Sequence, residues 1–119
     1  MSLTVEEFKK LQDEQLETGS IIMIKFGASW CRPCKKIKPV CCELIPQLRG
    51  DVLFTEIDID ESLDLYMLFK KKKMLKGVPT ILVWTQNNNR DPEHWFIPDD
   101  SVSGSKESDY RLFFSKYLN

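Results

Sequence analysis

The chain has 119 residues, and its 17 Lys and Arg nearly balance 18 Asp and Glu, giving a formal net charge of −1. This length suits one compact domain of about 100–200 residues, and the near-neutral balance argues against a nucleic-acid-binding protein. No apolar run approaches the roughly 20 residues of a membrane span, and the N-terminus lacks both a basic leader and an apolar signal core, which predicts a cytoplasmic protein without a membrane partner.

The chain begins with a predicted helix followed by a buried strand. Thr4 and Glu7 have capping-box spacing, in which a hydroxyl accepts a hydrogen bond and a Glu three residues later returns one. The helix that they start is expected to end at Gly19. Residues 21–26 are apolar apart from Lys25, which predicts a strand with both faces buried.

The middle of the chain predicts two more helices and two more strands. An apolar stripe at helical spacing runs over 34–48, with Pro39 inside it as an expected bend. Residues 52–59 alternate in part and predict a strand. Residues 63–73 have the composition of a helix, and 81–85 are a third predicted strand.

The last third predicts a loop, an edge strand and a closing helix. Residues 86–93 are polar and rich in turn formers. Residues 94–97 are a candidate edge strand that Pro98 closes. Apolar side chains at helical spacing then predict a final helix, with Ser105 or Ser108 as its cap.

This order of elements predicts the fold class. Strand–helix–strand connections of this length require parallel pairing, whereas the last two strands, joined by a loop, can pair antiparallel. The chain is therefore predicted to be a single α/β domain over residues 1–119, with a mixed sheet between layers of helices.

All four cysteines lie within one stretch of 12 residues, so they cannot connect distant parts of the fold. Cys41 falls on the apolar stripe of its helix and is predicted to be a buried thiol. Cys42 lies beside that stripe and is expected nearer the surface. A regulatory second disulfide or an intermolecular one is an open alternative, whereas a Cys41–Cys42 bridge would be strained.

Cys31 and Cys34 stand where the first predicted strand ends and a helix begins. The free N–H groups and positive dipole at a helix start stabilise a thiolate, which is the reactive form in disulfide exchange. Pro33 suits a first helical turn, and the second sulfur can reach the first. The pattern predicts a redox pair. The alternative is half of a zinc site, completed by the other two cysteines or His94.

Residues 26–35 (FGASWCRPCK) resemble the active-site segment of the thioredoxin family. Pro39 matches the proline that bends the family's active-site helix, and residues 77–80 (GVPT) match the segment that carries its cis-proline. The order of elements agrees over 4–118, except that the family's first strand is short or missing. The resemblance implies the thioredoxin fold, a mixed central sheet flanked by α-helices.

The resemblance implies a protein-disulfide reductase, with Cys31 as the nucleophile and Cys34 resolving the mixed disulfide. It also implies a cis Pro79, a Val78 backbone free to pair with an extended substrate, and a Trp30 that covers the approach to the nucleophile. Its partners would be disulfide-containing proteins and an electron-donating reductase or glutathione system, acting on a monomer without cofactor or metal. The alternative is a redox sensor or adaptor that binds partners without turnover.

Two positions near the cysteines depart from the family. Lys25 stands where the family usually has a buried Asp, and Glu56 falls on the neighbouring strand where many bacterial members have Lys. We predict a charge-reversed pair that assists proton transfer at Cys34; the alternative is a Lys25 that extends to solvent without a chemical role. Arg32 replaces a common Gly, and its cation is expected to make the disulfide more oxidising.

Charge is also concentrated further along the chain. Residues 70–73 are four lysines, and Lys76 follows them just before the predicted cis-proline. They predict a basic rim that steers acidic partner proteins. The alternative is that these lysines stabilise a helix C-terminus. The 86–93 loop is extended relative to typical members, as either a partner-specific tip or a tolerated insertion.

Overall fold

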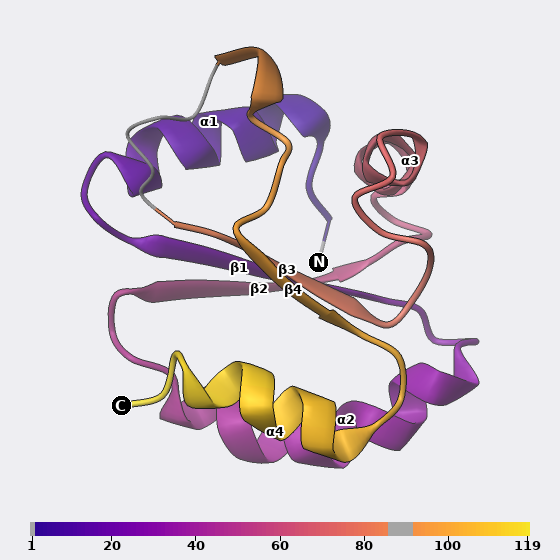
Figure 1. The fold of residues 1–119 in the computed structure, drawn as a ribbon. Coiled ribbons are helices and arrows are strands. Elements are labelled where there is room, and N and C mark those ends of the chain that lie inside the picture. Colours follow the sequence, from indigo (N-terminus) through magenta and orange to yellow (C-terminus); the bar gives the residue numbers. More distant parts are fainter. Residues whose placement is uncertain (1, 86–91) are drawn as a thin grey trace.

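The computed structural model describes residues 2–85 and 92–119. In this part of the chain, four strands form one sheet in the order β2-β1-β3-β4, with helices on both faces (Figure 1). The elements in chain order are α1 (Val5–Leu16), β1 (Ile21–Gly27), α2 (Arg32–Leu44), the 3-10 helix η1 (Ile45–Gln47), β2 (Val52–Asp58), α3 (Leu63–Lys71), β3 (Thr80–Trp84), the 3-10 helix η2 (Pro92–His94), β4 (Asp100–Ser103) and α4 (Glu107–Ser115).

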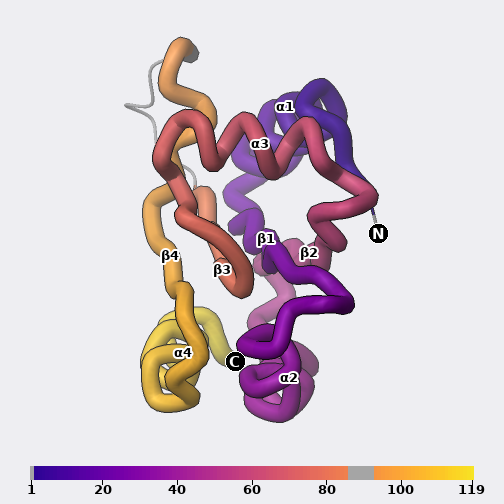
Figure 2. The backbone as a smooth tube through the Cα atoms, turned by 90° about the vertical axis from the view of Figure 1, so that its right-hand side faces the viewer, coloured from indigo at the N-terminus to yellow at the C-terminus, as the bar shows by residue number. Residues whose placement is uncertain are grey.

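The sheet is mixed, as the sequence predicts, but the parallel pairing predicted for both strand–helix–strand connections holds only for the first. The strand after α3 does not pair with β2 and instead lies antiparallel beside β1, so the prediction is wrong for it. β1 pairs with β2 in parallel and with β3 in the antiparallel sense, and β4 pairs with β3 antiparallel. Helices α1 and α3 cover one face, and α2 and α4 cover the other (Figures 1 and 2). None of the described helices has the length and hydropathy needed to cross a bilayer. Residues 2–4 form no strand.

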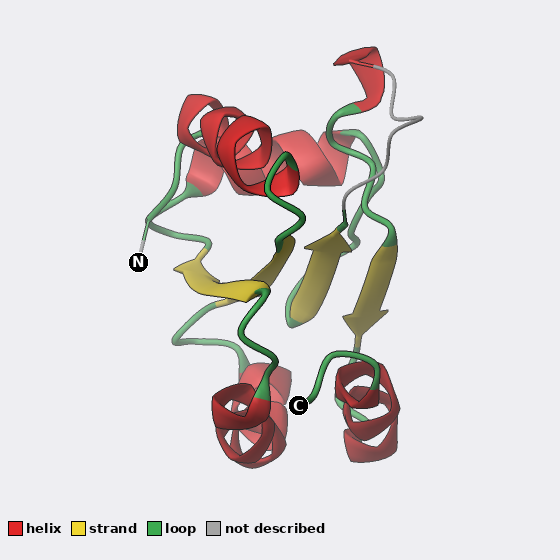
Figure 3. Ribbon diagram, turned by 90° about the vertical axis from the view of Figure 1, so that its left-hand side faces the viewer, coloured by secondary structure: helices red, strands yellow, loops and turns green. Residues whose placement is uncertain are grey.

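Strand β1 is buried because helices cover both of its faces (Figure 3). Alternate side chains along it enter different cores. Ile22, Ile24 and Phe26 join the cluster under α1 and α3, whereas Met23 joins the cluster under α2 and α4. Because the side-chain period of a strand is two residues, Lys25 shares the face of Met23.

The helix boundaries follow local chemistry. The predicted capping box is confirmed, because Glu7 N–H donates to Thr4 Oγ1 at 3.1 Å and Thr4 N–H donates to Glu7 Oε1 at 2.9 Å. Helix α3 ends at Lys71, two residues before the predicted end, where the left-handed backbone of Lys73 (φ 63°) stops the helix. The predicted serine cap of α4 is wrong, since Lys106 occupies the cap without a side-chain bond.

The predicted edge strand over 94–97 is also wrong, and β4 begins only at Asp100. Trp95 instead packs over α1, with its ring 5.9 Å from that of Phe8. Its carbonyl accepts a 2.8 Å hydrogen bond from Gln12 Nε2. The packing of this half-buried ring against α1 holds the segment outside the sheet. The predicted 86–93 loop lies largely outside the described residues, which resume at 92.

Candidate active site

The two cysteines of the predicted redox pair lie at the start of α2. Cys31 is the N-cap residue, and Cys34 lies in the first turn. They form a disulfide, with their Cα atoms 5.2 Å apart. The backbone N–H of Cys34 donates to Cys31 Sγ at 3.2 Å. This bond satisfies one of the free N–H groups of the helix start, and in the reduced protein it would stabilise a Cys31 thiolate.

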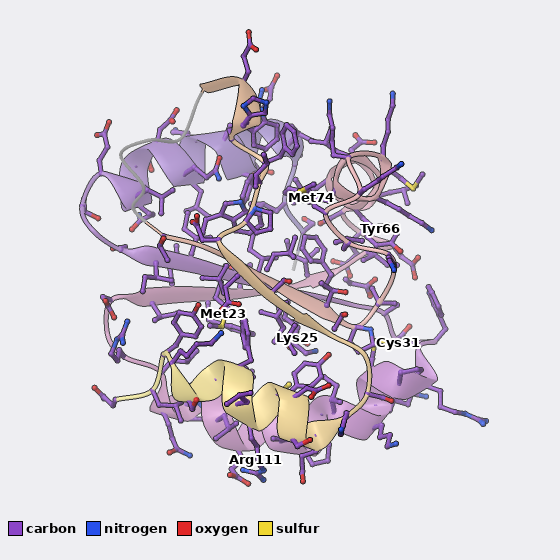
Figure 4. The ribbon with its side chains drawn as sticks, viewed as in Figure 1. Met23, Lys25, Cys31, Tyr66, Met74 and Arg111 are labelled. Carbon is purple, nitrogen blue, oxygen red and sulfur yellow. A yellow bond between two sulfur atoms is a disulfide. The ribbon has the colours of Figure 1, made fainter. Side chains whose placement is uncertain are left out.

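The end of β1 and a tight turn position this pair. Gly27 ends the strand, and the N–H of Cys31 donates to the carbonyl of Ala28 at 3.2 Å. Pro33 occupies the first turn of α2, where no backbone donor is needed. Figure 4 shows Cys31 beyond the end of the sheet, at the carboxyl ends of the parallel strands β1 and β2.

The Val78–Pro79 peptide is cis and lies at the same end of the sheet. Antiparallel pairing sets Thr80, the first residue of β3, opposite Phe26 near the end of β1. The segment before β3 therefore comes to the side of the sheet where α2 begins, as Figure 1 shows. The carbonyl of Pro79 accepts a 3.4 Å hydrogen bond from Gly104 N–H, which joins this segment to the end of β4.

Trp30 directly precedes the nucleophile candidate and is 64% exposed. Its indole Nε1 donates to Asp60 Oδ2 at 2.9 Å, and the N–H of Asp60 donates to Asp58 Oδ1 at 2.8 Å. The turn after β2 thus fixes an exposed ring beside the cysteines. Sequence reasoning missed Asp60, although an acidic turn after the neighbouring strand was the signal available. Arg32 is exposed on the first turn of α2.

The predicted Lys25–Glu56 pair is present. The two residues are partners in the β1–β2 register, and Lys25 Nζ lies 3.6 Å from Glu56 Oε2. The Lys25 side chain is 7% exposed and that of Glu56 is 61% exposed. A methyl group built on Gly27 would lie 3.7 Å from Lys25 Nζ and 3.7 Å from Cys34 Sγ. The ammonium and the second sulfur therefore both border the same space beside Gly27.

The segment that contains the disulfide, Lys25, Glu56 and the cis-proline also matches a known protein family. A sequence model of the family described as thioredoxin matches residues 1–97. The chain belongs to the thioredoxin family. Its relatives include an H-type thioredoxin of Oryza sativa subsp. indica, 29% identical over 117 residues that cover 95% of this chain and 81% of the relative. A thioredoxin of Rickettsia felis is 29% identical over 90 residues, covering 76% of this chain and 79% of the relative.

Solved structures support the same fold. The crystal structure of Fasciola hepatica thioredoxin superposes with a TM-score of 0.67 at 24% identity, covering 98% of this chain and 97% of that one. The family model ends at residue 97, whereas this superposition covers nearly the whole chain. The thioredoxin fold predicted from the sequence is therefore confirmed, with β4 and α4 included.

A cavity of about 890 Å³ lies behind the disulfide of this thioredoxin-family protein, between α2 and β2. Lys25, Cys34 and Glu56 contribute to its lining, as do both remaining cysteines. Cys41 is buried and Cys42 is exposed, so the predicted positions of both thiols are confirmed. Burial raises the pKa of Cys41 from 9.0 to about 11, against the smaller lowering influence of Lys25.

The zinc alternative does not fit this arrangement. His94 belongs to η2 on the α1 side of the sheet, whereas α2 carries the cysteines on the other side (Figure 1). Among the described residues, no group of three or more metal-ligating side chains converges. The sheet therefore separates His94 from the four cysteines, which all lie at or on α2.

The basic run at the C-terminal end of α3 has a partly structural role. Lys70 Nζ lies 5.7 Å from the centroid of the Tyr66 ring, and Lys72 Nζ lies 5.2 Å from that of Phe96. Lys70 and Lys71 also occupy the last turn of α3, where cations are favoured. The steering of acidic partners by this run stays a prediction.

Proposed function

We propose that this protein reduces protein disulfides by dithiol–disulfide exchange, with Cys31 as the nucleophile and Cys34 as the resolving thiol. The observation that carries the proposal is the position of Cys31 Sγ at the N-cap of α2, where the Cys34 N–H donates to it. A thiolate at this position gains a charge-assisted hydrogen bond and the favourable end of the helix dipole. Membership of the thioredoxin family supports the same chemistry.

The reaction proceeds through two exchanges. The Cys31 thiolate attacks one sulfur of a substrate disulfide, forming a mixed disulfide, and the other substrate sulfur leaves as a thiolate that takes up a proton. The Cys34 thiolate then attacks the Cys31 sulfur. This step forms the Cys31–Cys34 disulfide and releases the second substrate thiol. Two electrons pass to the substrate, and a reductase or a thiol must return them before the next cycle.

We further propose that the substrate lies against Trp30, Arg32 and the Val78–Pro79 segment. Trp30 presents an exposed ring held by Asp60. The cis bond and the start of β3 lie at the same end of the sheet as Cys31. Extended backbone of the substrate would pair with Val78, and this main-chain pairing is independent of substrate sequence. Such a surface suits a range of protein substrates.

We assign proton transfer at Cys34 to Lys25 and Glu56. The Lys25 ammonium and Cys34 Sγ both lie 3.7 Å from the same point beside Gly27, so the cation favours a thiolate at the resolving sulfur. Glu56 is mostly exposed and lies 3.6 Å from the ammonium. It can therefore accept the proton through water and return it to solvent.

The electron donor, the compartment and the oligomeric state are also proposals. Turnover requires an electron donor, which is either a dedicated reductase or a glutathione system. A reductase function also requires a compartment that keeps thiols reduced, as the cytoplasm does. We propose that the monomer is the active form, since the disulfide and the Val78–Pro79 segment come from one chain.

Insulin reduction driven by dithiothreitol tests the proposal. We expect a rate well above that of dithiothreitol alone, complete loss of the gain in Cys31→Ser, and a trapped mixed disulfide in Cys34→Ser. Cys42→Ser is the matched control and should keep the wild-type rate, because Cys42 lies two turns along α2. If the wild type gives no Cys31-dependent rate, the alternative of a non-turnover sensor or adaptor replaces this one.

A further inference from the structure

The cavity behind the disulfide has walls of opposite charge. Its lining includes Lys35 and Lys38 from α2, and, facing them, Glu56 and Asp58 from β2 with Glu61 from the turn that follows. Its volume of about 890 Å³ lies within the range of about 300–1,000 Å³ that is typical of small-molecule sites. Such a cavity suits a small ligand that carries both an ammonium group and carboxylates.

The buried Lys25 adds a donor directed at the same space. An ammonium group has three N–H donors, yet the Lys25 side chain is 7% exposed and its one ion-pair partner among the described residues, Glu56, is 3.6 Å away. That distance is longer than a hydrogen bond. A carboxylate that enters the cavity could accept a hydrogen bond from this ammonium group.

The cavity also contains a thiol that the proposed reduction cycle does not use. Cys42 is exposed and free, and it lines the cavity two helical turns from Cys34. Its neighbour Cys41 lines the same space, but it is 2% exposed and burial raises its pKa to about 11. Of the two free thiols, Cys42 is therefore the one that can exchange with a disulfide at neutral pH.

We propose that this cavity binds a zwitterionic small-molecule disulfide of the glutathione class and that Cys42 is its site of attachment. The Cys42 thiolate attacks one sulfur of the glutathione disulfide. The bond between the two glutathione sulfurs breaks, a Cys42–glutathione mixed disulfide forms, and one glutathione leaves as a thiolate that takes up the proton lost by Cys42. Glutathione disulfide is thus the oxidant, and a free thiol reverses the step.

Attachment of glutathione to Cys42 would also affect the reduction cycle, and this consequence rests on the proposed function. A glutathionyl group on Cys42 would fill the cavity beside Cys34, Lys25 and Glu56. It would restrict proton transfer at the resolving sulfur. In a single turnover without added thiol, treatment with glutathione disulfide would therefore slow mixed-disulfide resolution in the wild type and not in Cys42→Ser.

Labelling of the oxidised protein tests the site independently of turnover. With Cys31 and Cys34 closed in their disulfide, Cys41 and Cys42 are the free thiols. The protein is incubated at neutral pH with glutathione disulfide, with the neutral bis(2-hydroxyethyl) disulfide or with the dicationic cystamine. The labelling rate with each disulfide is divided by the rate at which the small thiol N-acetylcysteinamide reacts with that same disulfide. Peptide mass spectrometry identifies the labelled residue.

We expect label on Cys42 and none on Cys41, and a normalised rate about two- to fivefold higher for glutathione disulfide than for the neutral reagent, as for one partly exposed ion pair. Lys38→Glu should remove this preference. Lys36→Glu is the matched control, because Lys36 is an exposed lysine of α2 that does not line the cavity.

Three results would overturn the proposal: equal normalised rates for the three reagents, label on Cys41, or an equal loss of preference in Lys36→Glu and Lys38→Glu. The comparison of reagents on the wild type stands even if a variant fails to fold. Failure of insulin reduction with intact labelling of Cys42 would instead contradict the proposed function alone.

Discussion

The two faces of the sheet are built differently. The face under α1 and α3 is dominated by packed aromatic rings, with Phe8, Phe69 and Trp84 at centroid distances of 4.7–5.6 Å. The face under α2 and α4 holds a buried lysine, the cysteines and a cavity. One strand, β1, supplies side chains to both faces.

The difference between the two faces of the sheet shows how a small domain accommodates reactive groups. Burying a charged side chain or leaving a cavity costs stability. The aromatic face contributes close packing and carries none of the groups that we assign to chemistry. We therefore expect substitutions on the α1/α3 face to change stability, and substitutions of polar groups on the α2/α4 face to change reactivity.

Phe69→Ala should have the largest effect on stability. Phe69 is fully buried and contacts the rings of Phe8, Phe26 and Trp84. Its truncation should lower the free energy of unfolding by about 3–5 kcal/mol, measured by urea denaturation. Met67→Ala is the control on the same helix, since Met67 is 50% exposed. A large loss of insulin reduction per folded Phe69→Ala molecule would contradict the division between the faces.

Lys25→Met should change the reactivity of the protein and leave its stability nearly unchanged. Because Glu56 is mostly exposed, the substitution leaves no buried unpaired charge, and we expect stability to change by less than about 1 kcal/mol. If Lys25 and Glu56 transfer protons, resolution by Cys34 should slow on the order of 10²-fold. Stopped-flow measurement of mixed-disulfide resolution across pH separates these outcomes.

Lys36→Met is the control for Lys25→Met, because it removes an exposed cation from α2 without changing the cavity lining. It should resolve the mixed disulfide at the wild-type rate. An unchanged rate and an unchanged pH profile in Lys25→Met would eliminate the proton-transfer assignment, and a loss of several kcal/mol in stability would show that Lys25 is chiefly structural.

Sequence patterns predicted the features that depend on near neighbours. The Thr4–Glu7 cap, the apolar run of β1 and the spacing of Cys31 and Cys34 all involve residues within one turn or one strand. The Lys25–Glu56 contact could also be predicted, because the resemblance to the thioredoxin family sets the two strands side by side in parallel register.

The features that sequence patterns missed depend on contacts between distant residues. The predicted edge strand does not form because Trp95 packs, half-buried, against Phe8, which is far away in sequence. The bond between Trp30 and Asp60 joins residues 30 positions apart. The cavity between α2 and β2 has no sequence signature, since periodicity specifies which side chains face inward and not how completely they fill the space.

Alkaline pH should destabilise the protein through the α2/α4 face. Burial raises the pKa of Cys41 from 9.0 to about 11, and it also raises the pKa values of Tyr110 and Tyr117. Above pH 9 the unfolded chain therefore loses protons that the folded protein still holds, so the free energy of unfolding falls as pH rises through this range. Urea midpoints between pH 8 and pH 11 measure the decline.

Cys41→Ala tests the source of that decline. Whatever its offset in stability, this variant should show a shallower fall between pH 9 and pH 11, because one raised pKa is gone. Phe69→Ala, on the other face, should keep the wild-type slope. Parallel slopes in wild type and Cys41→Ala would show that the Cys41 thiol does not contribute to the alkaline loss.

The smallest effect is expected at the exposed start of α2. Arg32 lies between the two cysteines in sequence and is exposed, so its cation stabilises the reduced thiolate only through solvent. An exposed charge pair contributes about 0.2–1 kcal/mol, which corresponds to about 5–20 mV for a two-electron couple. Arg32→Gly should therefore make the disulfide less oxidising by this amount in a redox titration against glutathione, with the shift shrinking at high salt.

Lys36→Gly, one turn on, provides the control for removing a helical cation. An Arg32→Gly protein as oxidising as the wild type, or more so, would show that the α2 backbone stabilises the thiolate without help from Arg32.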